Sequence, residues 1–460
     1  MLQLEAVKQN PSLILKRGNH LNKEKKNLSL LFFPIFLELL CMMLTGAADT
    51  FMLSSVGDQA VGAVGTANSY ISIFLIMFSV ISSGMVAVMT QYIGAGRPGV
   101  ARQALKLGLI FNACVGVCFT ILLTLGGETI LTAVGIAEGL KDHATIYLQT
   151  VGLFCLCNAL TPIFSSYLRA FGHTTPTLIS TLVANAVNLT LNAVFLYVCD
   201  WGVLGVALAT GISRLTHLLW LIVAASRRIR IAKDPTPPSN GTIFKRIIQV
   251  GLPAAMESAL YNLAITFVIR FLNQMDETGF QAIARSYAIQ INNFSYCVGA
   301  ALAQANAILV GWRIGAGEFE RCDRGTRKAG IIAICSGAGT AAIFALLAHP
   351  IVGLFTTDGE MIRIVGYLLI VDIALEIGRA SNLVFGFALK TSGDATYPML
   401  VAIVFAFLCA AGGTWFFGIK LGWLVIGAYI AMALDECTRA VFMFLRWHSG
   451  KWRTKNLVAK

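Results

Sequence analysis

Acidic and amide side chains lie inside long apolar runs of this sequence, where they could bind an ion or a proton. Asp49 lies in the stretch TGAADTFML, and Glu38 lies 11 residues before it. Eleven residues make close to three helical turns, or about 16 Å, so both carboxylates are expected on one face of a helix. A charged group in the bilayer costs at least about 2.5–3.5 kcal/mol and usually marks an ion or proton path. The structural alternative for Asp49 is a buried carboxylate bonded to a neighbouring helix.

A second polar stripe is expected in the stretch NAVNLTLNAVF. Asn188 and Asn192 are spaced i,i+4, so they share one face of a helix. Thr210 is the polar point of the small-residue segment that follows. Carboxylate, amide and hydroxyl oxygens could coordinate Na⁺, whereas a single desolvated carboxylate could carry a proton, and the residues leave both open. The structural alternative for the Asn pair is a set of interhelical hydrogen bonds.

The second half of the chain places three charges in one apolar run. Asp372, Glu376 and Arg379 follow one another at i, i+4 and i+7, so they occupy a single helix face. Arg379 could neutralise one of the two carboxylates. A structural role and a substrate-binding role are both open for this group, because buried charge pairs occur in both.

Four further residues are candidates for gating or for contact with a substrate. Glu38 and Glu257 are each expected near the start of a helix, where water reaches them. A gating role therefore competes with a simple interfacial role for both, and the interfacial role is favoured for Glu38. Gln290 and Asn293 are weaker candidates for the lining of a cavity.

The elements that must position these residues are membrane helices. The chain has 460 residues, of which 57% are hydrophobic and 13% charged, with a mean hydropathy of +0.73. A soluble domain carries about twice that charged fraction, and a membrane helix needs about 20 mostly apolar residues. We therefore predict an all-α integral membrane protein with twelve transmembrane helices. The expected spans are 30–54, 60–92, 103–125, 143–169, 176–199, 203–225, 243–272, 281–311, 327–348, 362–389, 397–418 and 423–446.

The formal net charge of +12 is distributed unevenly along the chain. Basic residues gather in the N-terminal tail and in alternate loops, and the opposite loops carry acidic residues. Positive charge on one side predicts a multi-pass protein of the plasma (inner) membrane with both termini in the cytoplasm. This loop pattern explains the excess of basic residues better than nucleic-acid binding does, so we expect no nucleic-acid partner. We expect a monomer surrounded by membrane lipid.

An internal repeat of about 220 residues divides the chain. PIFLEL (34–39) matches PAAMES (253–258), IGAG occurs at 93–96 and at 314–317, and RAFGHTTP (169–176) matches KTSGDATYP (390–398). Six spans in each repeat predict two lobes related by a parallel pseudo-two-fold axis, as in transporters that rock around a central site. The expected parts are a cytoplasmic tail (1–27), an N-lobe (28–225), a cytoplasmic linker (226–242), a C-lobe (243–447) and a second cytoplasmic tail (448–460).

Motifs of other functional classes are missing from the sequence. It contains no G-x-x-x-x-G-K-[ST] phosphate loop, no H-E-x-x-H and no G-x-S-x-G, so neither an ATPase nor a membrane-embedded enzyme is expected. The cysteines have no histidine at ligand spacing, and we expect no metal site. We predict no cofactor other than a coupling ion, H⁺ or Na⁺.

The ordered motifs resemble those of the multidrug and toxic compound extrusion (MATE) family over about residues 28–447. They are ADTFML, GAVGTA, QYIGAGR, LRAFGHTTP, VGLPAAMES and WRIGAGE. The resemblance implies two six-helix lobes and antiport of organic compounds against H⁺ or Na⁺. It also implies an N-lobe cation site formed by Asp49, Asn188, Asn192 and Thr210. Some members have Asp where this chain has Asn192, and the lower formal charge here favours the proton.

Other members carry a C-lobe pair of acids, from which this chain departs. Glu257 lies about one turn nearer the cytoplasm than their seventh-helix Glu, and Arg379 falls near their tenth-helix Asp. Arg379 could instead contact an anionic or zwitterionic substrate. We predict an antiporter that exports amphipathic organic compounds, with a flippase for a lipid-linked sugar or an exporter of an anionic metabolite as alternatives. The flippase is disfavoured because Arg379 is the only cation expected deep in the membrane.

Overall fold

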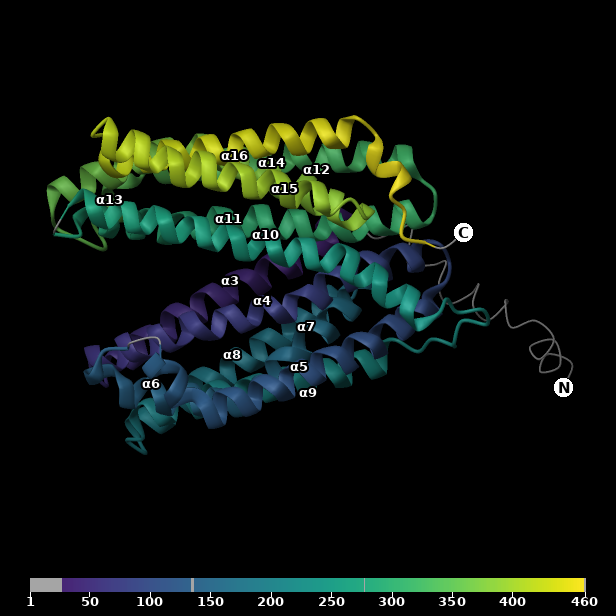
Figure 1. Cartoon of the computed structure of the whole chain (residues 1–460), viewed down its shortest axis with the longest axis horizontal. Helices are drawn as coiled ribbons and strands as arrows, with labels where there is room; N and C mark the ends of the chain where they lie inside the picture. The colour runs from purple at the N-terminus through teal and green to yellow at the C-terminus, as the bar shows by residue number, and fades with distance from the viewer. Residues whose placement is uncertain (1–26, 134–135, 277, 459–460) are drawn as a thin grey trace, which may run out of the picture.

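A computed structural model describes residues 27–133, 136–276 and 278–458, and within these ranges the regular structure is entirely helical (Figure 1). The first lobe contains α3 (Leu28–Ser54), α4 (Asp58–Gly94), α5 (Pro98–Ala133), α6 (Glu138–Leu153), α7 (Cys155–Ala170), α8 (Thr174–Tyr197) and α9 (Gly202–Arg228). The second contains α10 (Asn240–Met275), α11 (Phe280–Gly315), α12 (Phe319–Leu346), α13 (Ala348–Val352), α14 (Gly359–Ser392), α15 (Thr396–Phe405) continued by η1 (Ala406–Gly412) and η2 (Thr414–Lys420), and α16 (Leu424–His448).

The helices match the twelve spans expected from the sequence. In the described part of the chain, nine helices are long and apolar enough to cross a membrane, and α6 with α7, bent by 50°, makes a tenth. The remaining two, α14 and α16, have 34 and 25 residues and carry several charges within the helix. Large apolar side chains such as Phe51, Leu125 and Leu346 are mostly exposed, as lipid-facing residues are. The prediction of an all-α membrane protein is therefore confirmed.

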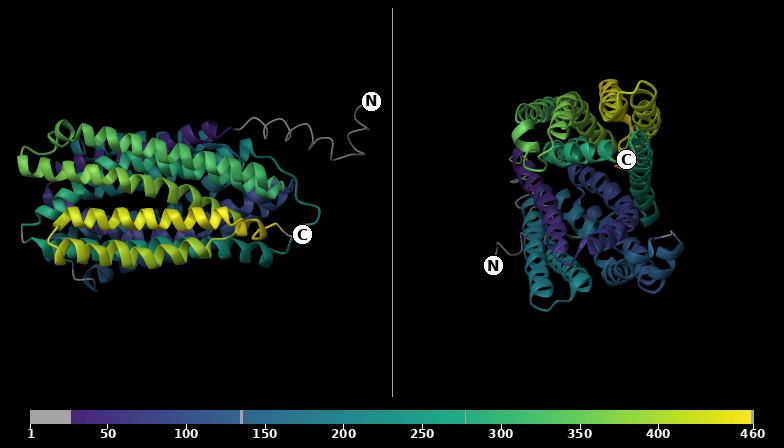
Figure 2. Two further views of the ribbon diagram at one scale, coloured as in Figure 1. Left: turned by 90° about the horizontal axis from the view of Figure 1, so that it is seen from above. Right: turned by 90° about the vertical axis from the view of Figure 1, so that its left-hand side faces the viewer.

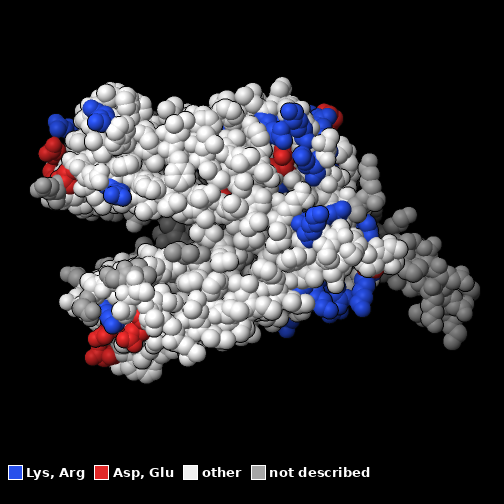
Figure 3. All heavy atoms as spheres, viewed as in Figure 1, with Lys and Arg blue, Asp and Glu red and all other residues white. Residues whose placement is uncertain are grey.

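The two lobes touch at one end of the molecule and separate at the other. Lys and Arg gather at the end where α4, α7, α9, α11, α14 and α16 finish, which we call the basic end (Figure 3). At the opposite end, where α3, α5, α8 and α10 finish, patches of Asp and Glu lie beside a few Lys and Arg at the tips of both lobes, and we call it the acidic end. The space-filling view shows a cleft between the lobes that opens at the acidic end (Figure 3). Figure 2 shows the lobes as separate helix groups when the molecule is viewed along its length.

Four glycines let helices of the two lobes cross in contact at the basic end. A Cβ on Gly84 or Gly251 would overlap a carbonyl group of the facing helix in the α4–α10 crossing. The α4–α11 crossing has the same character, because a Cβ on Gly94 would overlap the Trp312 carbonyl and one on Gly315 the Gln91 carbonyl. Gly94 and Gly315 are equivalent positions of the repeated IGAG motif, so the repeat places the same close contact on both sides of the crossing.

The C-terminal segment also joins the lobes at the basic end. The Leu457 side chain is 3% exposed and belongs to a buried apolar cluster that also includes residues of α3, α4, α10 and α11. The Gln91 side chain accepts a hydrogen bond from the Leu457 N–H at 2.8 Å and donates one to the Thr391 carbonyl at 2.7 Å. Residues 451–458 therefore form part of the packed structure, whereas most of the N-terminal tail that we expected lies outside the described residues.

The connection between the lobes is shorter than the expected linker and is fixed to the N-lobe. It spans residues 229–239, because α9 continues to Arg228 and Ser239 caps the start of α10 by accepting a hydrogen bond from the Thr242 N–H at 3.2 Å. Asp234 forms an ion pair with Arg97 at 3.1 Å, and Arg97 also donates to the Thr236 carbonyl. The linker is thus docked along the loop between α4 and α5.

Acidification is expected to release this linker only under strongly acidic conditions. Hydrogen bonding from Arg97 lowers the pKa of Asp234 below its usual value of 3.8. The pair therefore stabilises the docked linker fully above pH 3.8, and this contribution is lost as the pH falls through the lowered pKa. Hydrogen exchange of the amides in 231–236 should be slower in the wild type than in Asp234→Asn at neutral pH, and the difference should shrink well below pH 3.8. Equal exchange of the two proteins at neutral pH would contradict the docking.

Candidate functional site

The N-lobe contains a hydrogen-bonded chain of three of the four predicted cation ligands. Asn192 donates from Nδ2 to Asp49 Oδ1 at 2.8 Å and lies 3.5 Å from Asn188 Oδ1. Both asparagines are buried, and Asn192 Oδ1 has no hydrogen-bond partner among the described residues. Asp49 has no ion pair in the described part of the chain, although Arg214 is near enough to act on it electrostatically. The carboxylate of α3 and the amides of α8 therefore meet as expected.

The fourth predicted ligand, Thr210, belongs to the same region but makes no hydrogen bond to Asp49, Asn188 or Asn192 in the described structure. Its side chain is near Tyr147 of α6, whose hydroxyl donates to Asn68 Oδ1 at 3.2 Å. Tyr147 is also within electrostatic reach of Asp49. Tyr147 and Arg214 were not predicted as site residues, and neither stands out in the sequence, because only the packing of the helices brings them near Asp49.

Glu38 is buried and paired, and the expectation that water reaches it is wrong. Its side chain is 4% exposed, forms an ion pair with Arg169 of α7 at 2.7 Å and accepts a hydrogen bond from Thr177 of α8 at 2.9 Å. Arg169 also donates to Gln304 of α11 at 2.7 Å, so this link crosses from the N-lobe to the C-lobe. Arg169, Gln304 and Lys390 line a cavity of about 300 Å³ between the lobes.

The C-lobe has the matching ion pair at the matching position of the repeat. Lys390 of α14 contacts Glu257 of α10 at 2.9 Å, and their side chains are 17% and 21% exposed. Glu257 corresponds to Glu38 and Lys390 to Arg169 in the repeat of the sequence. The first helix of each lobe is thus joined to the end of the fourth by the same kind of contact, which opposes an unpaired interfacial role for either Glu.

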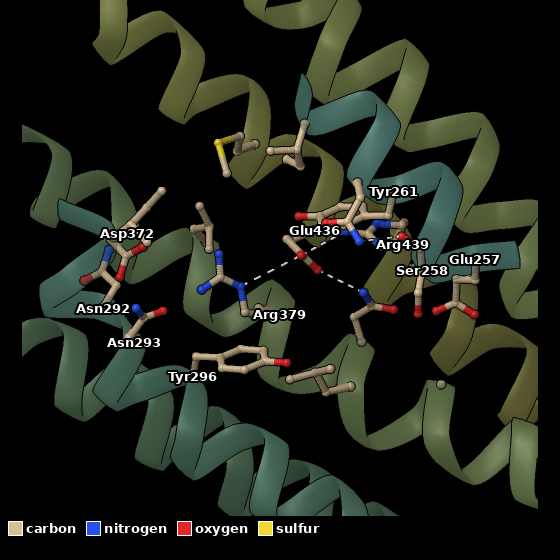
Figure 4. Close-up of a pocket in the computed structure, with 18 of the residues that line it drawn as sticks. Glu257, Ser258, Tyr261, Asn292, Asn293, Tyr296, Asp372, Arg379, Glu436 and Arg439 are labelled. Carbon is tan, nitrogen blue, oxygen red and sulfur yellow. Dashed lines mark hydrogen bonds and ion pairs between the residues drawn. The ribbon is translucent and has the colours of Figure 1, made fainter. Parts of the chain in front are cut away.

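A second polar site is a cavity of about 630 Å³ inside the C-lobe (Figure 4). Helices α10, α11, α14 and α16 surround it, with α15 contributing Pro398. Its volume suits a drug-sized molecule, since such pockets span about 300–1,000 Å³. Asn293 lines this cavity, whereas Gln290 is exposed outside its lining and accepts a hydrogen bond from Asn293 at 3.4 Å.

Two charged residues of α16 that were not predicted, Glu436 and Arg439, line this cavity. Arg439 of α16 contacts Asp435 at 2.7 Å and Glu436 at 2.8 Å. Arg379 pairs with Glu376 and lies 3.9 Å from Glu436 (Figure 4). The stretch ALDECTRAVF carries the α16 charges inside an apolar run, so the rule that singled out Asp372 could have found them.

One expectation about Arg379 is therefore corrected. It is not the only cation deep in the protein, because Arg285 and Arg439 also line the cavity. Its guanidinium pairs with Glu376 and lies 3.9 Å from Glu436, so an anionic substrate would compete with these carboxylates for it. Asp372 shares the cavity lining with Arg379, but neither of its oxygens has a hydrogen-bond partner among the described residues. The argument against a flippase that rested on a single deep cation no longer holds.

Known proteins resemble this chain over nearly its whole length. The MatE family model matches residues 34–194 and 253–415, which together exceed half of the chain. The "Uncharacterized transporter YisQ" of Bacillus subtilis (strain 168) is 29% identical over 434 residues, covering 93% of this chain and 95% of that protein. The "Probable multidrug resistance protein NorM" of Thermotoga maritima is 25% identical over 455 residues, covering 96% and 97%.

Solved structures agree with this fold. A MOP superfamily transporter from Pyrococcus furiosus, described as having a binding pocket of reverse polarity, aligns with a TM-score of 0.84 at 18% identity, covering 92% of this chain and 95% of that one. A multidrug resistance MATE family transporter in an outward-facing conformation aligns equally well, with the same TM-score, identity and coverage. The twelve-helix, two-lobe fold and the family model agree, so this chain belongs to the MatE family of multidrug efflux transporters and is an integral membrane transporter, not an enzyme.

Proposed function

We propose that this protein is an antiporter that exports amphipathic organic compounds across the plasma membrane in exchange for protons. The observation that carries the proposal is the Asp49–Asn192 contact at 2.8 Å, a carboxylate without an ion pair among the described residues, inside a lobe that borders the cleft. No cofactor other than the coupling ion is part of the proposal. Each chain holds both lobes and both cavities, which supports function as a monomer, and no nucleic-acid partner is part of the proposal.

The orientation follows from the distribution of charge. Basic loops remain in the cytoplasm in multi-pass proteins, so the basic end with the C-terminal segment is the cytoplasmic end. The cleft then opens to the outside, and the glycine crossings and the Glu38–Arg169–Gln304 link close the path to the cytoplasm. Rocking of the two lobes would have to separate these contacts before a substrate could enter from the cytoplasm.

The charge of the cluster favours a proton over Na⁺ as the coupling ion. Asp49 is its single carboxylate, hydrogen-bonded by Asn192 Nδ2, whereas a second carboxylate would strengthen Na⁺ binding. A protonated Asp49 could instead donate to Asn192 Oδ1, which has no partner in the described part of the chain, after rotation of the amide.

Protonation of Asp49 would thereby change the contact between α3 and α8. The same two helices meet again at Glu38 and Thr177, next to the Arg169 link to the C-lobe. A shift of α3 against α8 would therefore reach the contacts that hold the basic end closed. The names of relatives such as NorM support multidrug compounds as the substrate class.

Efflux from proteoliposomes tests the proposal. Vesicles are loaded with ethidium, an amphipathic organic cation, and an inward proton gradient or an inward Na⁺ gradient is imposed separately. We expect the proton gradient to accelerate efflux and the Na⁺ gradient to leave it at the rate of protein-free vesicles. Acceleration by Na⁺ alone would assign the site to Na⁺, and no acceleration by either ion would reject antiport of this compound.

A further inference from the structure

The charged residues of the C-lobe cavity are paired with one another, with two exceptions in the described part of the chain. Glu257 pairs with Lys390, Arg379 with Glu376 and Glu436, and Arg439 with Asp435 and Glu436. The exceptions are Arg285 and Asp372, which line the same cavity and have opposite charge. A buried charge without a partner is costly, so a ligand that supplies the two missing partners would gain affinity from both.

Asp372 and Asn292 provide unsatisfied acceptors at one part of the cavity. Asp372 is 1% exposed and Asn292 is 4% exposed, yet neither Asp372 oxygen nor Asn292 Oδ1 has a hydrogen-bond partner among the described residues. The close-up shows the two side chains on the same side of the cavity, on facing helices α14 and α11 (Figure 4). An ammonium group has three N–H donors and no acceptor, so it matches this set of oxygens.

Arg285 is the only cavity cation in the described residues that could hold an anionic group. Its Nε is buried and makes no hydrogen bond there. The other deep arginines, Arg379 and Arg439, share three carboxylates, namely Glu376, Asp435 and Glu436. That cluster holds more negative than positive charge and would repel an anion, whereas Arg285 could pair with a carboxylate through its fork of N–H donors.

The spacing of these groups sets the length of the ligand. Arg285 and Asn292 are seven residues apart on α11, so they lie on one face and about 10 Å apart along the helix. Tyr429 lines the same cavity as these two residues. Tyr261, Tyr296 and Tyr429 add aromatic surface to the lining, which suits a flat ring between the two charged ends.

We propose that this cavity binds an organic zwitterion, with its anionic group on Arg285 and its ammonium group on Asp372 and Asn292. Because α11 begins at the acidic end, the anionic group lies nearer the open end of the cleft and the ammonium group lies deeper. The inference rests on the proposed function in that the bound zwitterion is the exported compound. The binding site itself, however, needs no gradient.

Three related probes separate the two anchors. They are 4-(4-aminobutyl)benzoic acid, its methyl ester, which lacks the negative charge, and its N-acetyl derivative, which lacks the positive charge. Their dissociation constants are measured by calorimetry on the purified full-length protein in lipid nanodiscs, without any ion gradient. The wild type should bind the zwitterion about tenfold or more tighter than either derivative, since each lost charged hydrogen bond weakens binding by about that factor.

Variants assign each charge to its partner. Arg285→Gln should weaken binding of the two probes with a carboxylate, the zwitterion and the N-acetyl derivative, about tenfold and leave binding of the methyl ester unchanged. Asp372→Asn should weaken binding of the two probes with an ammonium group, the zwitterion and the methyl ester, and leave binding of the N-acetyl derivative unchanged. Arg285→Lys keeps the charge and should retain most of the affinity, which covers a failure of Arg285→Gln to fold. Arg363→Gln is the matched control, because it removes an exposed arginine of α14 that is outside the cavity lining.

The pattern of losses decides the proposal. Equal losses for all three probes, or no loss in either variant, would overturn it, and an Asp372→Asn protein that binds all probes normally would leave Asp372 to a proton or Na⁺. If proton-driven efflux fails but the binding pattern is found, the site stands and antiport is wrong. If efflux succeeds and the pattern is missing, the compound binds elsewhere.

Discussion

Replacing Asp49 by Asn is expected to reduce proton-driven efflux to the rate of passive leakage. An Asn side chain has nearly the same shape and could still accept the hydrogen bond from Asn192, which is 2.8 Å long in the wild type. It cannot take up and release a proton, so the coupling would be lost while the packing of α3 against α8 is kept. The measurement is ethidium efflux from proteoliposomes under an imposed pH gradient.

Two comparisons separate lost coupling from a damaged protein. Asp142→Asn removes an exposed carboxylate of α6 near the acidic end and should leave efflux unchanged. Asp49→Asn should also still exchange substrate between the two sides of the vesicle when no gradient is imposed, because exchange of substrate for substrate moves no net proton. Full gradient-driven efflux by Asp49→Asn would show that Asp49 does not carry the coupling proton.

The spans could be predicted because a helix that crosses the lipid needs about 20 mostly apolar residues. Each long apolar run became a helix, and the runs fall at the expected places. Helix ends were harder, since polar residues outside the membrane can extend a helix without an apolar signal. Thus α12 begins at Phe319, although the apolar run begins only at 327.

The pairs of side chains that join different helices could not be predicted from the sequence. The repeat correctly matched Glu38 with Glu257, but their partners Arg169 and Lys390 lie 131 and 133 residues away and meet them only through the crossing of helices. The burial of Glu38 depends on the same crossing, so its position near a helix start suggested exposure to water. Leu457 likewise became buried because the C-terminal segment folds back between the lobes.

In the C-lobe site, some charged residues could have been predicted from the sequence and one could not. Asp435, Glu436 and Arg439 were visible as charges in an apolar run, and the general rule for such residues applied to them. Arg285 carried no such distinction, because an arginine near a helix start is ordinary in sequence. Its importance follows from an absence of partners in the described structure, and the partners of a residue are known only when all the helices around it are placed.

Replacing Gly315 by Ala is expected to destabilise the protein much more than a typical Gly→Ala change in a helix. Its Cβ would overlap the Gln91 carbonyl, and the helices would have to move apart at the basic end. Overpacking of this kind costs about 1–3 kcal/mol, and backbone atoms cannot turn aside as a side chain does. Thermal unfolding of the purified protein measures the effect.

Gly339 of α12 provides the matched control for this change. It is exposed, and a Cβ there would meet no atom within 4 Å, so Gly339→Ala should be neutral or slightly stabilising through its higher helix propensity. A melting temperature of Gly315→Ala equal to that of Gly339→Ala would mean that the crossing is looser than the structure shows.

The expected loss of stability at the crossing has a mechanistic consequence, since separation of α4 and α11 at the basic end is the movement that opens the protein to the cytoplasm. Gly315→Ala should therefore favour that open state.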